Sequence, residues 1–314
     1  MRIPRWVKWT AGTLVGIVVA VQVAYRVADP ETKSLTDADR TGVAGAFVRL
    51  GDGVTHYELA GPDTAHLVVL AAGASVPHYI WDSTFHALTQ AGFRVLRYTY
   101  YGRGWSDRPD IAYTPDLYVR QLSQLLDTLH VTTPIDLAGL SFGGSVITSF
   151  ASAHPQRVRS LIYVDPYIRA RRTPPAWQRS FFLVDRLMLF ASSPTMASGQ
   201  LKDFLHPERW PDWPDRYRVQ MSFKGFRRAR VSEAIANADL DQAAELAEVG
   251  AHPRPVLVIW GRQDRTVPFS FSERLMKAMP RARLLAVDSG AHLPHMEQSG
   301  LVQPSIMEFL RRVP

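Results

Sequence analysis

The chain has 314 residues, enough for one large domain or two small ones, and its 46% hydrophobic and 21% charged residues are ordinary for a globular protein. It has no cysteine, which excludes disulfide bonds, thiolate metal sites and a cysteine nucleophile. The formal charge of +7 is concentrated in residues 167–230, which hold 13 Lys and Arg against 5 Asp and Glu. Because this segment is aromatic and shows no recognised nucleic-acid-binding module, no nucleic-acid partner is predicted.

The first element along the chain is an uncharged apolar run at residues 9–25, with Arg2, Arg5 and Lys8 before it and aromatic residues at its edges. Its length is near the lower limit of about 17 residues for a membrane-spanning helix. We therefore expect residues 1–27 to be a membrane anchor, with residues 28–45 as a linker. The positive-inside rule then places the body on the extracytoplasmic side. A cleaved signal sequence, giving a secreted protein, is the alternative.

The body alternates predicted strands with predicted helices. Segments that flank Gly51-Asp52-Gly53 predict a hairpin. Continuous apolar runs of strand length follow at residues 66–72, 94–98, 135–138, 160–164, 256–260 and 283–287. Helical patterns lie between them at residues 84–91, 116–129, 145–153, 271–278 and 302–312. This alternation predicts an α/β fold with a mostly parallel sheet flanked by helices and with ligands at the carboxyl ends of the strands.

The alternation stops between Pro166 and Pro255, where the chain is rich in Trp, Phe, Arg and proline turns. A structureless loop of this length is uncommon in a compact domain. We therefore predict a helical cap at residues 167–250, inserted between two parts of the core at residues 46–166 and 251–314.

A Gly-x-Ser-x-Gly motif runs from Gly139 to Gly143 and places Ser141 between a predicted strand and a predicted helix. This context is typical of a nucleophile elbow, in which a sharp turn exposes the serine hydroxyl at the end of the sheet. The main-chain N–H of Phe142 would then lie at a helix N-terminus, where a developing oxyanion is stabilised.

A serine nucleophile needs a base, and an imidazole base needs a carboxylate to orient it. His292, in the loop after the last predicted strand, is the candidate base, and His295 is its rival. Asp264, after the preceding strand, is the candidate acid, with Asp165 as the alternative. The two histidines have no further ligand at helical spacing, so no metal site is predicted.

Five motifs stand together in the body: Ala-Gly-Ala-Ser from residue 72, Tyr-Gly-Arg-Gly-Trp-Ser-Asp-Arg-Pro from residue 101, the elbow, Gly-Arg-Gln-Asp-Arg-Thr-Val-Pro from residue 261, and Ala-His-Leu-Pro-His-Met-Glu from residue 291. On these motifs the chain from about residue 47 onward resembles the α/β-hydrolase fold superfamily. The resemblance is to capped serine hydrolases such as monoacylglycerol lipases, carboxylesterases and C–C bond hydrolases.

The resemblance implies a triad of Ser141, Asp264 and His292, with Ala74 as a second oxyanion N–H beside Phe142. Ala72 departs from the family pattern, which usually has His at this position. Two further departures are in the turn after the next strand, where Thr99 and Tyr101 replace the common Asp and Arg.

The function that we expect is a serine carboxylesterase or lipase without a cofactor, acting on a hydrophobic or lipid-like ester held by the aromatic cap. The sequence leaves three alternatives open: a C–C bond hydrolase, a cofactor-free perhydrolase and a non-catalytic ligand-binding protein. A second hypothesis is that cap arginines face an anionic headgroup or an acidic group of the substrate.

Overall fold

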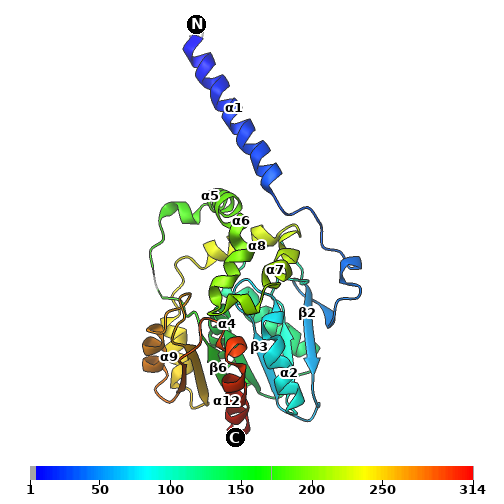
Figure 1. Ribbon diagram of the computed structural model, residues 1–314, viewed down its shortest axis with the longest axis vertical. Helices are drawn as coiled ribbons and strands as arrows, with labels where there is room; N and C mark the ends of the chain where they lie inside the picture. Colours follow the sequence, from blue (N-terminus) through cyan, green and yellow to red (C-terminus); the bar gives the residue numbers. More distant parts are fainter. Residues whose placement is uncertain (1–4, 171, 314) are drawn as a thin grey trace.

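An eight-stranded β-sheet runs through the computed structural model, which describes residues 5–170 and 172–313 (Figure 1). Its strands are β1 (Ala46–Leu50), β2 (Gly53–Ala60), β3 (Leu67–Ala71), β4 (Arg94–Tyr98), β5 (Ile135–Leu140), β6 (Val158–Val164), β7 (Val256–Gly261) and β8 (Arg283–Val287). They are ordered β1-β2-β4-β3-β5-β6-β7-β8. β2 runs antiparallel to both of its neighbours, and β3 to β8 are parallel. The predicted fold class and hairpin are therefore confirmed.

The central strands are apolar because helices cover both faces of the sheet. Every residue of β3, β5 and β7 is buried, whereas β1 at the sheet edge is partly exposed. A parallel strand that is covered on both faces reads as a continuous apolar run, since neither side of its pleat meets water. This is why the six runs in the sequence located the parallel strands so closely.

Two groups of helices cover the sheet. One group contains α2 (Asp82–Gln90), α11 (Pro294–Glu297) and α12 (Ser299–Arg312), which pack against one another. The other contains α3 (Pro115–Thr128), α4 (Phe142–Ala153), α9 (Ala243–Ala251) and α10 (Phe271–Ala278), which are linked by contacts from α3 to α4, α4 to α9 and α9 to α10. α4 begins directly after Ser141, three residues before the predicted start.

The chain between β6 and β7 is helical and lies over one edge of the sheet (Figure 1). Its longer helical elements are α5 (Phe181–Leu187), the π-helix η5 (Met188–Ser192), α6 (Ser193–Gly199), α7 (Trp213–Met221) and α8 (Phe226–Ala236), followed by α9. α9 packs on the core helices α4 and α10, while α5 to α8 pack mainly on one another. The predicted domain limits stay a prediction. We use "cap" for residues 167–250.

The N-terminal helix α1 (Arg5–Ala28) projects away from the body (Figure 1). No helix in the described ranges has both the length and the hydropathy to cross a bilayer, so the predicted membrane anchor is wrong, and with it the placement of the body beyond a membrane. The uncharged run ends at Tyr25, and Arg26 follows it in the last turn of the helix. The Tyr25 hydroxyl donates a hydrogen bond of 2.8 Å to Asp185 in α5, which ties this end of the helix to the cap.

Candidate active site

Ser141 occupies a strained turn between β5 and α4. Its φ of 52° and ψ of −119° are rare for a residue with a side chain, and such strain is typical of functional positions. The flanking glycines are needed for close packing. A Cβ atom at Gly139 would lie 2.5 Å from the carbonyl oxygen of Gly143, and one at Gly143 would overlap the carbonyl oxygen of Ala71. The turn therefore has the geometry expected of an elbow.

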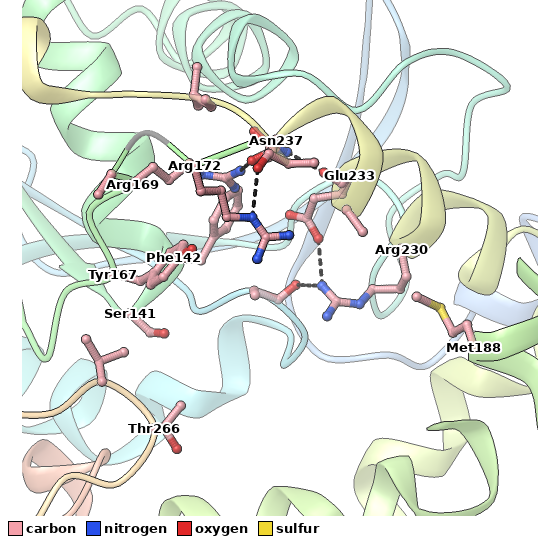
Figure 2. A pocket seen from close by; sticks show the side chains of 16 residues that line it. Ser141, Phe142, Tyr167, Arg169, Arg172, Met188, Arg230, Glu233, Asn237 and Thr266 are labelled. Atoms are coloured by element: carbon pink, nitrogen blue, oxygen red, sulfur yellow. Dashed lines mark hydrogen bonds and ion pairs between the residues drawn. The ribbon is translucent and has the colours of Figure 1, made fainter. Parts of the chain in front are cut away.

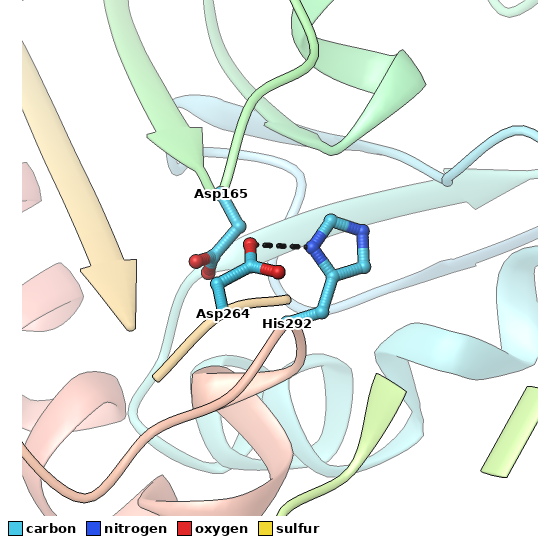
Figure 3. A group of neighbouring side chains, drawn as sticks. All are labelled: Asp165, Asp264 and His292. Carbon is cyan, nitrogen blue, oxygen red and sulfur yellow. Dashed lines mark hydrogen bonds and ion pairs between the residues drawn. The ribbon is translucent and has the colours of Figure 1, made fainter. Parts of the chain in front are cut away.

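Asp264 and His292 form a buried hydrogen-bonded pair at the ends of β7 and β8 (Figure 3). His292 Nδ1 donates to Asp264 Oδ2 at 2.7 Å. The other oxygen, Oδ1, accepts the main-chain N–H groups of Thr266 at 2.7 Å and Val267 at 2.9 Å. These bonds hold the carboxylate in one orientation and place the imidazole proton on Nδ1. Nε2 is left as the basic nitrogen.

The alternative acid, Asp165, lies beside Asp264 but does not bond to His292 (Figure 3). It ends β6 with a φ of 42° and is fully buried. Its Oδ1 accepts the Gly261 N–H at 2.8 Å, and its Oδ2 has no hydrogen-bond partner among the described residues. Burial, reinforced by the Asp264 charge, raises the pKa of Asp165 well above its ordinary value. The protonated form of Asp165 is therefore favoured over what an exposed aspartate would show.

The rival base, His295, is buried away from this pair. Its ring packs against Trp81 in a tilted arrangement with the ring centres 4.6 Å apart, and its Nε2 lies 3.0 Å from the carbonyl oxygen of Ile80. Burial lowers the pKa of His295 to about 4. An imidazole that already bonds to a main-chain carbonyl in the core is a packing residue.

One group of side chains in the described ranges has potential metal-ligand atoms within 4.8 Å of one another. It consists of Asp165, Asp264 and His292. A metal ion there would have to break the bond between Asp264 and His292. The arrangement fits proton transfer better than metal binding.

The Ser141 hydroxyl makes no hydrogen bond in the described part of the chain, so Ser141 and His292 are not hydrogen-bonded to each other in this structure. Both residues stand at the carboxyl edge of the sheet, since they follow the parallel strands β5 and β8. Such hydrogen bonds are often long without substrate and tighten when substrate binds.

The two predicted oxyanion residues, Ala74 and Phe142, line one pocket together with Ser141. Phe142 is the first residue of α4, where the helix leaves its N–H groups without intrahelical partners. The Ala74 loop is held through its carbonyl oxygen, which accepts hydrogen bonds from Arg103 at 2.6 and 2.8 Å and from Arg230 at 2.7 Å. Arg103 and Arg230 were not singled out from the sequence. The Gly-Arg-Gly turn around Arg103 was the available signal for one of them.

The pocket has a volume of about 410 Å³ and lies between the sheet edge and the cap (Figure 2). Among the described residues, four charged side chains line it: Arg169, Arg172, Arg230 and Glu233. The aromatic residues of α5 to α8 do not line it. Phe204, Trp213, Tyr217, Phe223 and Phe226 are buried within the cap, and Trp177, Phe181, Phe182 and Phe190 are exposed.

A sequence profile of the alpha/beta hydrolase family matches residues 68–302. The chain belongs to this family. It is 28% identical over 267 residues, covering 82% of this chain and 96% of the relative, to a protein of Variovorax paradoxus (strain S110) named as a candidate carbamate hydrolase. It is also 27% identical to a 2-hydroxymuconate semialdehyde hydrolase of Pseudomonas putida, over 69% of this chain and 76% of the relative.

Solved structures agree on the fold. A hydrolase from Pseudomonas aeruginosa PA01 superposes with a TM-score of 0.72 and 28% identity, covering 86% of this chain and 99% of that structure. The chain is a hydrolase of the alpha/beta hydrolase type. The bond that it cleaves and the substrate that it binds have to be inferred from the geometry of the site.

Proposed function

We propose that this protein is a serine hydrolase that cleaves carboxylic esters through an acyl-enzyme on Ser141. The observation that carries the proposal is the buried bond between His292 and Asp264, which stands at the same sheet edge as the strained Ser141 turn. An imidazole held with Nε2 unprotonated is the base that a serine hydroxyl requires.

The proposed reaction has two balanced halves. His292 Nε2 takes the proton of Ser141 as its oxygen attacks the ester carbonyl carbon, and the N–H groups of Phe142 and Ala74 donate to the resulting oxyanion. The ester C–O bond breaks, and the alcohol leaves with the proton from His292. Water then gives a proton to Nε2 and attacks the acyl carbon, which releases the carboxylic acid and restores Ser141. Asp264 stabilises the imidazolium in both halves.

A C–C bond hydrolase with the same triad is the second candidate. The relative of that activity in Pseudomonas putida, 27% identical over 227 residues, supports it. Carbamate hydrolysis has comparable support from the relative in Variovorax paradoxus. In all three reactions a negatively charged oxygen would be bound by the same N–H groups of Phe142 and Ala74. A panel of 4-nitrophenyl esters, aryl carbamates and vinylogous 1,5-diketones therefore separates the three by kcat/KM.

Labelling with a fluorophosphonate probe tests the nucleophile directly. The wild-type protein should gain one probe mass, located on the peptide that contains Ser141, and the Ser141→Ala protein should gain none. Ser289→Ala, an exposed serine in the loop before His292, is the matched control and should label like the wild type. Labelling that persists in Ser141→Ala, or that is missing from the folded wild type, would contradict the proposal and leave a ligand-binding protein.

A further inference from the structure

The substrate pocket carries more positive than negative charge. Three arginines and one glutamate line it, and the arginines come from two separate segments, the loop after β6 and helix α8 (Figure 2). Ser141 opens into the same pocket. Whatever is hydrolysed there is therefore bound beside guanidinium groups.

The one carboxylate of the pocket is already fully used. Glu233 Oε2 accepts hydrogen bonds from Arg103 and Arg230, both at 2.6 Å, and Oε1 accepts from the Tyr118 hydroxyl at 3.0 Å. Burial alone would raise the pKa of Glu233, but Arg103 and Arg230 hold it below its ordinary value. Glu233 is thus ionised, and it holds the two arginines that bond to the carbonyl oxygen of Ala74.

Arg169 is only 6% exposed, and Glu233, whose charge acts on it, is hydrogen-bonded to two other arginines instead. Arg169 Nη1 donates to the main-chain oxygen of Asn237 at 3.1 Å, its Nε has no hydrogen-bond partner, and it forms no ion pair with the residues described. Its guanidinium lies 5.2 Å from the ring centre of Phe142, the residue after the nucleophile. Burial lowers the pKa of Arg169, while the nearby Glu233 charge acts in the opposite direction.

Arg172 is the second cation without a carboxylate. Its Nε donates to the carbonyl oxygen of Ala238 at 2.9 Å and its Nη2 to the side chain of Gln178 at 2.5 Å, so only neutral acceptors hold it in the described structure. Figure 2 shows Arg169 and Arg172 entering from the same loop, above Phe142 and Ser141. Two guanidinium groups without a carboxylate partner among the described residues thus share one wall of the pocket.

We propose that this wall is a binding site for an anionic group of the substrate, so that the ester cleaved at Ser141 carries a second carboxylate or phosphate group. The inference rests on the proposed function for its location beside Ser141. A planar guanidinium donates two parallel hydrogen bonds to a carboxylate or phosphate, and such charge-assisted bonds are the strong ones. A purely apolar acyl chain would leave the buried Arg169 and the exposed Arg172 without an anionic partner.

Two esters that differ only at the far end of the acyl chain test the site. The 4-nitrophenyl monoester of adipic acid carries a carboxylate where 4-nitrophenyl hexanoate has a methyl group. We expect the wild type to favour the adipate ester by about tenfold to a hundredfold in kcat/KM. That preference should shrink as NaCl rises from 0.02 to 0.5 M. A hexanoate ester that carries a terminal phosphate tells which anion fits better. Equal kcat/KM for the anionic and neutral esters would overturn the inference while leaving the hydrolase proposal intact.

Variants separate substrate binding from a structural role. Arg169→Gln and Arg172→Gln should each lower the ratio of the two kcat/KM values by about tenfold. A merely structural arginine would lower both values together and leave the ratio unchanged. Arg172 is exposed, so its variant remains informative if the Arg169 variant does not fold. Arg179→Gln, whose guanidinium pairs with Asp239 on the cap surface, is the matched control and should preserve the ratio.

A binding measurement keeps the inference testable even if no ester is hydrolysed. By calorimetry, the Ser141→Ala protein should bind adipate at least tenfold more tightly than the neutral adipamide, and Arg172→Gln in that background should remove the difference. Equal binding of the two, or equal binding with and without Arg172, would overturn the proposal.

Discussion

The edge of the sheet and the cap differ in whether their charged side chains have partners within the protein. At the edge, each oxygen of Asp264 has a hydrogen-bond partner, and burial beside Asp264 raises the pKa of Asp165, which disfavours a second negative charge. In the cap, some arginines are paired, as Arg227 is with Asp29 and Asp185, while Arg169 and Arg172 are not. At the edge the bond between Asp264 and His292 is already formed, whereas these last two arginines in the cap have no carboxylate partner among the described residues.

This difference separates two kinds of functional residue. Residues that move protons must be oriented before substrate arrives, so their bonds are made within the protein. Residues that select a substrate have hydrogen-bond donors or acceptors that are unpaired until the substrate binds. Changes at the edge should therefore affect all substrates alike, and changes in the cap wall should depend on the substrate.

The largest effect is expected from His292. His292→Ala should lower kcat/KM for any ester by about 10⁶-fold, because Ser141 then has no base. His295→Gln is the matched control, since a glutamine amide can still donate to the carbonyl oxygen of Ile80. It should keep kcat/KM within about threefold of the wild type at pH 8. A large loss in His295→Gln with His292→Ala still active would reverse the roles assigned to the two histidines.

The two aspartates at the edge should differ almost as much. Asp264→Asn should cost about 10⁴-fold in kcat, because the amide favours the wrong imidazole tautomer. Asp165→Asn keeps the shape of a side chain that makes no hydrogen bond to His292, so kcat should change by less than about tenfold. Steady-state kinetics at pH 8 compares them, and the opposite ranking would identify Asp165 as the acid.

The cap also contributes stability through Glu233. Glu233→Gln leaves the fully buried Arg103 without its carboxylate, which should lower the free energy of unfolding by about 3 to 5 kcal/mol. Glu308→Gln removes an exposed ion pair with Arg312 and should cost under about 1 kcal/mol. Urea unfolding measures both. Equal losses would mean that the buried pair between Arg103 and Glu233 contributes no more to the free energy of unfolding than an exposed ion pair.

The smallest effect is a pH dependence from His295. Its pKa is about 4 in the folded protein and near the ordinary 6.5 when unfolded. The unfolded state therefore binds more protons between pH 6.5 and 4, and stability falls as pH falls through that window. The loss at pH 5 relative to pH 8 should be about 2 kcal/mol. His295→Gln should remove this part, and His56, whose pKa burial also lowers to about 4, should keep the rest. Urea midpoints that shift equally in wild type and His295→Gln would contradict this assignment.

Local sequence patterns predicted most of the sheet and the elbow correctly. The apolar runs located the parallel strands because burial on both faces demands them, and Gly139 and Gly143 marked a turn that admits no Cβ. The anchor prediction was wrong because no described helix, α1 included, is apolar enough over the length that a bilayer requires. None of the cap aromatic residues named above lines the pocket, because five of them are buried inside the cap and the other four are exposed on its surface.

The sequence by itself determined the fold class and the candidate side chains at the sheet edge, since each follows a strand whose direction and neighbours are set by its apolar pattern. Only the tertiary structure decided that His292 rather than His295 bonds to an aspartate, and that this aspartate is Asp264. It also decided which cap arginines find carboxylates. Ion pairing depends on distances between segments far apart in the chain, and no local pattern encodes those distances.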